Sequence, residues 1–128
     1  MKCLDSTFCI DLLKGLPEAR ARAEELVRLG ERVAVAAPAI TEVLVGAFRQ
    51  GGQRLSQALE FFAEVEVLDV DEGIAIEAAR AGGECLRRGE PVGTTDLLIA
   101  ATAKKHHAHL VSRDRDFARI PGLTLETY

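Results

Sequence analysis

The sequence predicts an α/β domain with a mainly parallel central sheet, flanked by helices on both faces in three α/β/α layers. Short apolar runs rich in valine and small residues alternate along the chain with longer segments whose apolar residues recur at helical spacing. Strands separated by helices are typical of parallel sheets, whose strands are apolar along most of their length. The 128 residues suffice for one core and are too few for two ordinary ones, so we expect a single domain over residues 1–128.

Boundary residues define the first elements. Residues 2–5 predict a short buried strand, after which Ser6 or Thr7 is suited to cap a helix. Gly15 ends that helix, and Pro17 fits the first turn of the next one, because proline needs no backbone donor there. We therefore expect a strand followed by a helical hairpin.

The middle of the chain repeats this alternation. Residues 32–36 are β-branched or small, as in a second buried strand, and the helix that follows begins at Pro38 and ends near Gly51. Residues 53–63 carry apolar side chains at helical spacing, whereas residues 65–70 alternate as a strand does.

The C-terminal half contains two further helices and two further strands. Residues 71–88 favour a helix, although Gly82 and Gly83 weaken its middle by about 1 kcal/mol each relative to alanine, so we expect a kink. The remaining predicted elements are a helix capped by Thr94 or Thr95 and strands at residues 109–112 and 124–127.

Four acidic residues from distant segments occupy similar places in this pattern, at the end of a predicted strand or early in a predicted helix. They are Asp5, Glu42, Asp96 and Asp114. Because ligands of parallel sheets gather beyond the carboxyl ends of the strands, we expect these acids to meet. Two ionised carboxylates about 4 Å apart repel by roughly 4 kcal/mol at an effective dielectric near 20, so such a cluster requires a cation. Oxygen ligands favour Mg²⁺ or Mn²⁺.

Composition excludes several classes of protein. Hydrophobic residues make up 48% of the chain and charged residues 28%, as in folded globular proteins. No apolar run approaches the roughly 20 residues that cross a bilayer, so we expect a cytoplasmic protein that does not enter the membrane. Cys3, Cys9 and Cys85 are odd in number and lack CxxC spacing, which predicts buried thiols rather than disulfides or a zinc site. The four acids account for the whole formal charge of −4, so metal binding would remove the charge that opposes contact with nucleic acid.

Four segments resemble, in order and spacing, the PIN domain family, and within it the VapC-like toxins of prokaryotic toxin–antitoxin pairs. They are Leu4-Asp5-Ser6-Thr7, Thr41-Glu42-Val43-Leu44, residues 89–103 around Asp96, and residues 110–117 around Asp114. The resemblance covers essentially the whole chain. It implies a metal-dependent endoribonuclease that leaves 5′-phosphate and 3′-hydroxyl ends, forms a homodimer, and is inhibited by a cognate antitoxin whose tail enters the catalytic cleft.

The residues that the resemblance makes catalytic and metal-binding are Asp5, Glu42, Asp96 and Asp114. The fourth acid is ambiguous, because only Arg115 separates Asp114 from Asp116, where many relatives have a longer gap. We place Asp114 first because it directly follows the predicted strand, and Asp116 then supports it or binds a second ion. Ser6 and Ser112 are expected to support the site. Ser112 stands where relatives often have threonine, and its hydroxyl is suited to hold a carboxylate.

The remaining polar residues carry weaker signals. Arg113 and Arg115 flank the fourth acid and are candidates for contacts with RNA phosphates, although ordinary solvated charges explain them equally well. The three histidines lie near the C-terminal end of a predicted helix, where cations offset the helix dipole. We therefore expect structural or surface roles for His106, His107 and His109.

Alternative functions stay open beside a toxin ribonuclease. One is a catalytically weak module that binds RNA or a partner without turnover, and another is a PIN nuclease of RNA processing that has no antitoxin. A phosphohydrolase is disfavoured because Asp69-Val70-Asp71 lacks the threonine that follows such a motif. One set of apolar residues either packs in the core or forms a groove for an antitoxin helix, namely Leu12, Leu13, Leu16, Phe48, Leu55, Leu59, Phe61 and Phe62.

Overall fold

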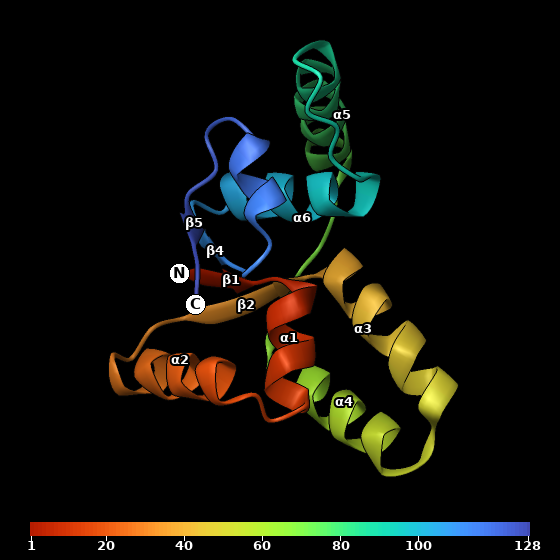
Figure 1. Cartoon of the computed structure of the whole chain (residues 1–128), viewed down its shortest axis with the longest axis vertical. Helices are drawn as coiled ribbons and strands as arrows, with labels where there is room; N and C mark the ends of the chain where they lie inside the picture. Colours follow the sequence, from red (N-terminus) through yellow and green to blue (C-terminus); the bar gives the residue numbers. More distant parts are fainter.

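The computed structural model describes residues 1–128 and has one five-stranded sheet surrounded by helices (Figure 1). The strands are β1 (Lys2–Leu4), β2 (Val33–Ala36), β3 (Glu66–Leu68), β4 (His109–Val111) and β5 (Leu125–Glu126). Neighbouring strands are all parallel, in the order β3-β2-β1-β4-β5, so β1 lies at the centre. The predicted parallel α/β fold is confirmed.

Helices cover both faces of the sheet. They are α1 (Ser6–Leu13), α2 (Pro17–Arg28), α3 (Ala37–Gln50), α4 (Gly52–Glu64), α5 (Glu72–Arg87) and α6 (Thr94–Lys105), with a short 3₁₀ helix η1 (Arg115–Arg119). Figure 1 shows α1 to α4 on one side of the strands and α5 and α6 on the other. Phe8 and Phe62 pack with Val35 in one buried cluster, while Ile74 and Ile99 belong to a second one. No helix combines the length and apolar character needed to cross a bilayer.

The carboxyl ends of three strands lie side by side. Leu4 at the end of β1 pairs with Val35 on one side and with Val111 on the other. Because the strands are parallel, the residues that follow them emerge at the same edge of the sheet. Asp5 and Ser112 are therefore neighbours at this edge.

Two helices begin differently from the prediction. Asp5 itself caps α1, since its carboxylate accepts a hydrogen bond from the backbone nitrogen of Thr7 at 3.4 Å, so neither Ser6 nor Thr7 is the cap. Gly93 precedes α6 and no side chain caps that helix, because Thr94 and its neighbour already lie within it.

Helix α5 is one continuous helix that includes both of its glycines. Gly82 is buried against α6, and a Cβ atom there would lie 2.7 Å from Cδ1 of Leu97. A Cβ atom at Gly83 would meet only the guanidinium of Arg87, at 3.9 Å. Gly82 thus lets α5 and α6 approach closely. This close packing explains why a glycine, which is intrinsically unfavourable within a helix, stands at this position.

Candidate active site

Asp5 is the most firmly held of the candidate acids. Its side chain is almost completely buried at the junction of β1 and α1. Oδ2 accepts hydrogen bonds from the hydroxyls of Thr7 and Ser112, both at 2.7 Å, and Oδ1 lies 3.3 Å from the hydroxyl of Ser6. These donors come from α1 and from the end of β4, so the centre of the sheet fixes the orientation of this carboxylate.

Glu42 joins the site through a serine. The hydroxyl of Ser6 donates to Oε1 of Glu42 at 2.9 Å and also lies within reach of Asp5. Glu42 itself is exposed on α3, the helix that follows β2. Ser6 therefore links the acid of α3 to the start of α1.

Burial and the negative charges of the other acids raise the pKa of Asp96. It lies half-buried in the first turn of α6, where the helix dipole normally favours a carboxylate. Its pKa is nevertheless raised from 3.8 to about 6. The causes are burial first, and then the negative charges of Asp5, Glu42, Asp114 and Asp116. The fold thus brings acids from four separate segments into one electrostatic neighbourhood.

Asp114 and Asp116 occupy the loop after β4. The backbone nitrogen of Asp114 donates to the hydroxyl of Ser112 at 3.0 Å, and the carboxylate of Asp114 caps η1 by accepting from the nitrogen of Asp116 at 2.9 Å. Asp116 is exposed and its carboxylate lies 3.3 Å from the guanidinium of Arg119. Asp114 is thus tied directly to the residue that also holds Asp5.

The donor set has the chemistry of a magnesium or manganese site, because hard divalent cations prefer carboxylate oxygens. As the side chains stand, no three acidic, histidine or cysteine residues are placed to hold one ion together. The acids converge on one region without forming a closed coordination sphere. Asp5 is fixed by the hydroxyls of Thr7 and Ser112, whereas the exposed side chain of Glu42 accepts a single hydrogen bond, from Ser6.

Comparison with known proteins decides the family. A sequence profile described as "PIN domain" matches residues 2–123. The chain belongs to the PIN domain family. The resemblance predicted from the four acidic segments is confirmed.

Relatives of this PIN domain match over nearly the full length. The tRNA(fMet)-specific endonuclease VapC of Salmonella typhimurium is 31% identical, with 98% of this chain and 96% of the relative covered. Ribonuclease VapC19 of Mycobacterium tuberculosis is 34% identical, with 96% and 97% covered. The DNA-bound VapBC complex of Salmonella typhimurium contains a chain that is 30% identical, with a TM-score of 0.83 and with 99% of this chain and 98% of that chain covered.

The arginines of the PIN domain differ in their availability. Arg113, a candidate phosphate contact, already forms a two-pronged ion pair with the buried carboxylate of Asp11. Arg119 pairs with Asp116 and also donates to the carbonyl oxygen of Pro91. Arg115 is exposed and makes no ion pair. Nothing in the local sequence indicates that Arg113 pairs with Asp11, which lies 102 residues away.

Histidines and cysteines lie outside the acidic site. His109 opens β4, at the opposite end of the strand, where its ring contacts Glu126 at 2.6 Å. All three cysteines are free and buried, and burial raises the pKa of Cys3 to about 12 and the pKa of Cys9 still further. The prediction of buried thiols rather than disulfides is confirmed.

A groove of about 220 Å³ lies between α1, α3 and α4, and Glu42 contributes to its lining. Of the apolar set considered in the sequence, only Leu13 lines it, and the other apolar lining residues are Ile10, Val43, Ala47 and Ala58. Phe62 belongs to the core, and four residues pack against that core, namely Leu12, Leu13, Leu16 and Phe61. Phe48 and Leu59 remain exposed. Core packing therefore explains most of this set.

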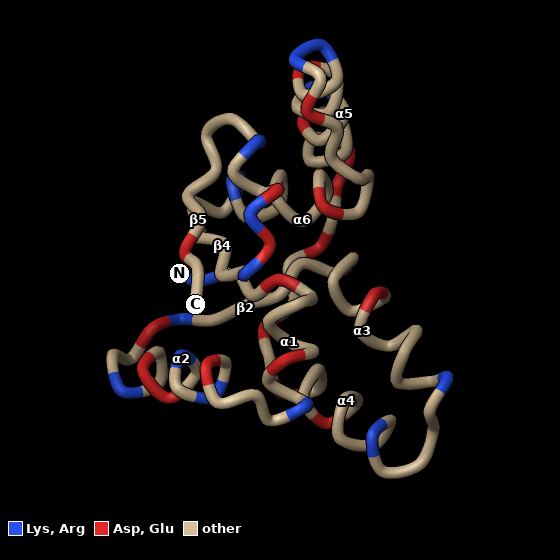
Figure 2. Tube along the Cα trace, viewed as in Figure 1, with Lys and Arg blue, Asp and Glu red and all other residues tan.

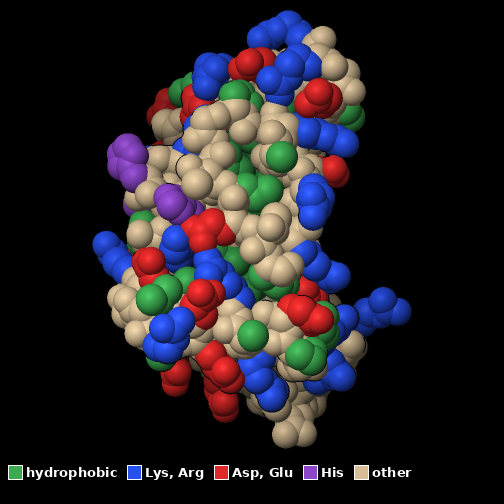
Figure 3. Space-filling view, turned by 60° about the vertical axis from the view of Figure 1, so that its left-hand side comes forward, with side chains coloured by type: hydrophobic (Ala, Val, Ile, Leu, Met, Phe, Trp, Pro, Cys, Tyr) green, Lys and Arg blue, Asp and Glu red, His purple; other side chains and the backbone are tan.

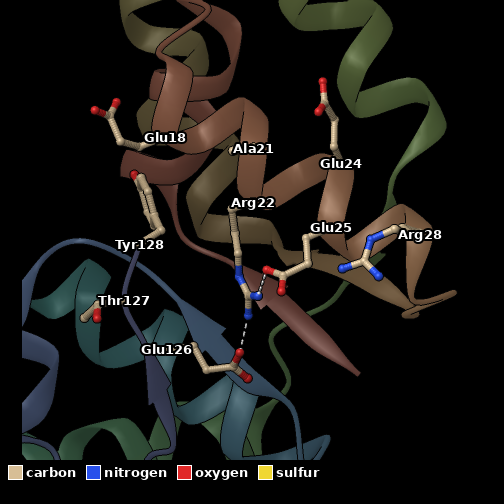
Figure 4. Close-up of a pocket in the computed structure, with 9 residues that line it drawn as sticks. All are labelled: Glu18, Ala21, Arg22, Glu24, Glu25, Arg28, Glu126, Thr127 and Tyr128. Carbon is tan, nitrogen blue, oxygen red and sulfur yellow. Dashed lines mark hydrogen bonds and ion pairs between the residues drawn. The ribbon is translucent and has the colours of Figure 1, made fainter.

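A larger hollow of about 830 Å³ lies away from the acids, between α2 and the C-terminal segment (Figure 4). Arg22 reaches across it to Glu25 and Glu126, and Tyr128 lies at its side. None of the candidate acids lines it. Its mixture of opposite charges continues along α2, where acidic and basic residues alternate (Figure 2). The charged residues of this hollow are thus accounted for in part by the ion pair that joins Arg22 of α2 to Glu126 of β5.

Proposed function

We propose that this PIN domain is a divalent-metal-dependent endoribonuclease and the toxin of a toxin–antitoxin pair. The observation that carries the proposal is the hydrogen bonding through Ser6 and Ser112, which links Asp5 to Glu42 and to Asp114. The raised pKa of Asp96, to which burial and then the charges of these acids contribute, agrees with it. Relatives named as an endonuclease and a ribonuclease, at 31% and 34% identity over nearly the whole chain, support the same activity. The RNA substrate, the metal and the antitoxin are parts of the proposal.

Asp5, Glu42, Asp96 and Asp114 would hold Mg²⁺ or Mn²⁺. A divalent ion held there lowers the pKa of water and neutralises charge on the scissile phosphodiester. The hydroxyls of Thr7 and Ser112 fix the carboxylate of Asp5, while Ser6 orients Glu42. Asp116 supports the neighbouring acid or contributes to a second ion, and exposed Arg115 contacts RNA phosphates.

Cleavage of defined RNAs with and without Mg²⁺ or Mn²⁺ tests the activity. Asp5→Asn and Asp96→Asn should abolish metal-dependent cleavage, because each removes a ligand charge. Asp69→Asn is the matched control: Asp69 follows the edge strand β3 directly, is exposed, and does not contribute to the pKa shift of Asp96. Full cleavage by the Asp5 or Asp96 variant would refute the assigned roles, and RNA binding without cleavage by the wild type would favour a binding module.

The identity of the fourth acid needs its own comparison. Asp114→Asn should reduce cleavage more than Asp116→Asn, because Asp114 is bonded to Ser112, which also holds Asp5. Asp116 instead faces Arg119. The reverse order of the two variants would assign the fourth position to Asp116.

The toxin role is tested in cells. Induced expression should arrest growth, and Asp5→Ala should restore it. A small protein encoded next to this chain should form a complex with it and suppress the arrest, with its helix bound in the groove beside Glu42. We also propose a homodimer, which light scattering of the purified protein tests, and a cytoplasmic location, where RNA and antitoxin meet the toxin. Growth arrest that persists in the Asp5 variant would separate toxicity from nuclease activity.

A further inference from the structure

Asp11 is a buried carboxylate that the acidic site does not use. It lies on α1 and is 2% exposed. Its Oδ2 lies 2.8 Å from Nε of Arg113 and accepts a hydrogen bond from the hydroxyl of Tyr128 at 2.6 Å, while its Oδ1 accepts from a terminal nitrogen of Arg113 at 3.0 Å. We call Asp11, Arg113 and Tyr128 the C-terminal clamp. It joins α1, the loop after β4 and the last residue of the chain.

The clamp is rigid for physical reasons. A two-pronged arginine–carboxylate pair fixes distance and orientation together, unlike a single lysine contact. The ring of Tyr128 packs edge-on against buried Phe8, with ring centroids 4.8 Å apart. A carboxylate as deeply buried as that of Asp11 is costly without its cation, and this cost opposes opening of the pair.

The middle member of the clamp lies inside the acidic site's own loop. Arg113 is the one residue between Ser112, whose hydroxyl holds Asp5, and Asp114, whose backbone nitrogen donates to that same hydroxyl. Fixing the side chain of Arg113 on α1 therefore restrains the backbone on both sides of it. Since Asp5 caps α1 and Asp11 lies on the same helix, the clamp and the acid share one rigid support.

We propose that the C-terminal clamp positions Ser112 and Asp114 for metal binding, which makes Asp11, Arg113 and Tyr128 positioning residues of the site. The inference rests on the proposed function. It gives Arg113 a role different from contact with RNA, because its guanidinium is already committed to Asp11. It also gives the C-terminal residue a role in a site assembled at the carboxyl ends of β1 and β4.

The test measures Mn²⁺ binding to the full chain by electron paramagnetic resonance of the free ion, beside the melting temperature and the KM for RNA at saturating Mn²⁺. Asp11→Asn and Arg113→Lys should each weaken Mn²⁺ binding by about 10-fold, the lower limit for residues that orient metal ligands. Tyr128→Phe keeps the ring on Phe8 and removes only the hydroxyl, so it should weaken binding in the same direction while folding normally. KM at saturating Mn²⁺ should stay unchanged in all three.

Arg32→Lys is the matched control, because Arg32 and Glu66 form a second two-pronged pair at the other end of the sheet. Unchanged Mn²⁺ affinity in the three clamp variants, or an equal loss in Arg32→Lys, would overturn the inference. So would an increased KM for Arg113→Lys with unaltered Mn²⁺ affinity, the result expected of an RNA contact. If wild-type protein binds Mn²⁺ and the clamp variants weaken it, yet RNA is not cleaved, the proposed function fails while the clamp stands. A wild type without Mn²⁺ binding would overturn both.

Discussion

Ser112 shows how much one small side chain contributes to the site. Its buried hydroxyl donates to Asp5 and accepts from the backbone nitrogen of Asp114, so it connects two candidate ligands. Groups that orient metal ligands typically change affinity by 10- to 100-fold when removed. A hydroxyl is sufficient here because both partners lie at the same edge of the sheet.

Ser112→Ala should weaken Mn²⁺ binding by about 10- to 100-fold and lower the free energy of unfolding by about 1–2 kcal/mol, since a buried acceptor and donor lose their partner. Calorimetric titration and chemical denaturation measure the two effects. Thr102→Ala is the control: its buried hydroxyl donates only to the carbonyl oxygen of Leu98 within α6, so stability should fall without a change in metal affinity. Equal metal affinities in the two variants would contradict the role of Ser112.

Asp96 makes the metal-free protein sensitive to pH. Its pKa is about 6 in the folded chain and 3.8 without the surrounding structure, so the folded state binds the proton more tightly. Stability from this group is therefore greatest below about pH 4, decreases as the pH rises to about 6, and stays reduced above that. Because Asp96 is only half-buried, solvent screening limits the cost to about 1 kcal/mol.

Asp96→Asn should thus stabilise the metal-free protein by about 1 kcal/mol at pH 7 and have no effect near pH 4. Thermal unfolding in a chelator across this range measures the difference. Mg²⁺ should raise the melting temperature of the wild type and leave that of the variant unchanged, because the ion stabilises only a state that binds it. A constant difference between the two proteins at every pH would disprove the assigned pKa.

At the scale of the elements, the two glycines of α5 have the same low helix propensity but different surroundings. The sequence predicted that both weaken the helix, which is the intrinsic preference of glycine. Only the structure distinguishes Gly82, which is buried against Leu97 of α6, from Gly83. Gly82 allows close packing of two helices, which a sequence pattern within one helix cannot reveal.

Gly83→Ala should stabilise the protein by up to about 1 kcal/mol, because alanine favours the helix and its Cβ atom meets nothing closer than 3.9 Å. Gly82→Ala has the same helical advantage but places a Cβ atom 2.7 Å from Leu97, so it should be less stable than Gly83→Ala by at least about 1 kcal/mol. Urea denaturation of both variants decides the point. Equal gains would mean that α6 yields without cost.

At the scale of the whole molecule, strand order explains what the sequence predicted of the site. Every α-helix and strand was expected from periodicity and from Gly and Pro positions, with boundaries shifted by a few residues, whereas the short 3₁₀ helix η1 was not predicted. Acids after the strands were expected to meet, and Asp5 and Asp114 follow the two adjacent strands β1 and β4. Asp69 has a similar local context but follows the edge strand β3. Local sequence does not contain the strand order, and neither does it show that Asp11 pairs with residues 102 and 117 positions away.

Acidic and basic side chains are mixed on one face of the molecule (Figure 3). On the face shown in Figure 3, acidic and basic side chains are interspersed, without a patch of one sign. The excess of acids in the chain, 20 against 16 lysines and arginines, therefore matters most where acids gather at the carboxyl ends of the strands. On the edge strand β5 a single carboxylate, that of Glu126, instead meets three basic side chains from distant segments, namely Lys2, Arg22 and His109.

Glu126 should therefore control how firmly the C-terminal strand is held. Partial burial raises its pKa, but hydrogen bonds from Lys2 and His109 outweigh this and hold the pKa below the usual 4.5. Its contribution is fully present above pH 4.5 and is lost as the pH falls through the lowered pKa. Glu126→Gln should cost about 1–2 kcal/mol of unfolding free energy at pH 7 and little at low pH. Glu24→Gln is the control, because Glu24 is an exposed acid without a partner that lines the hollow between α2 and the C-terminal segment (Figure 4). This second substitution should cost nothing measurable. Denaturation of both variants at neutral and acidic pH compares them, and equal losses would show that this carboxylate does not anchor β5.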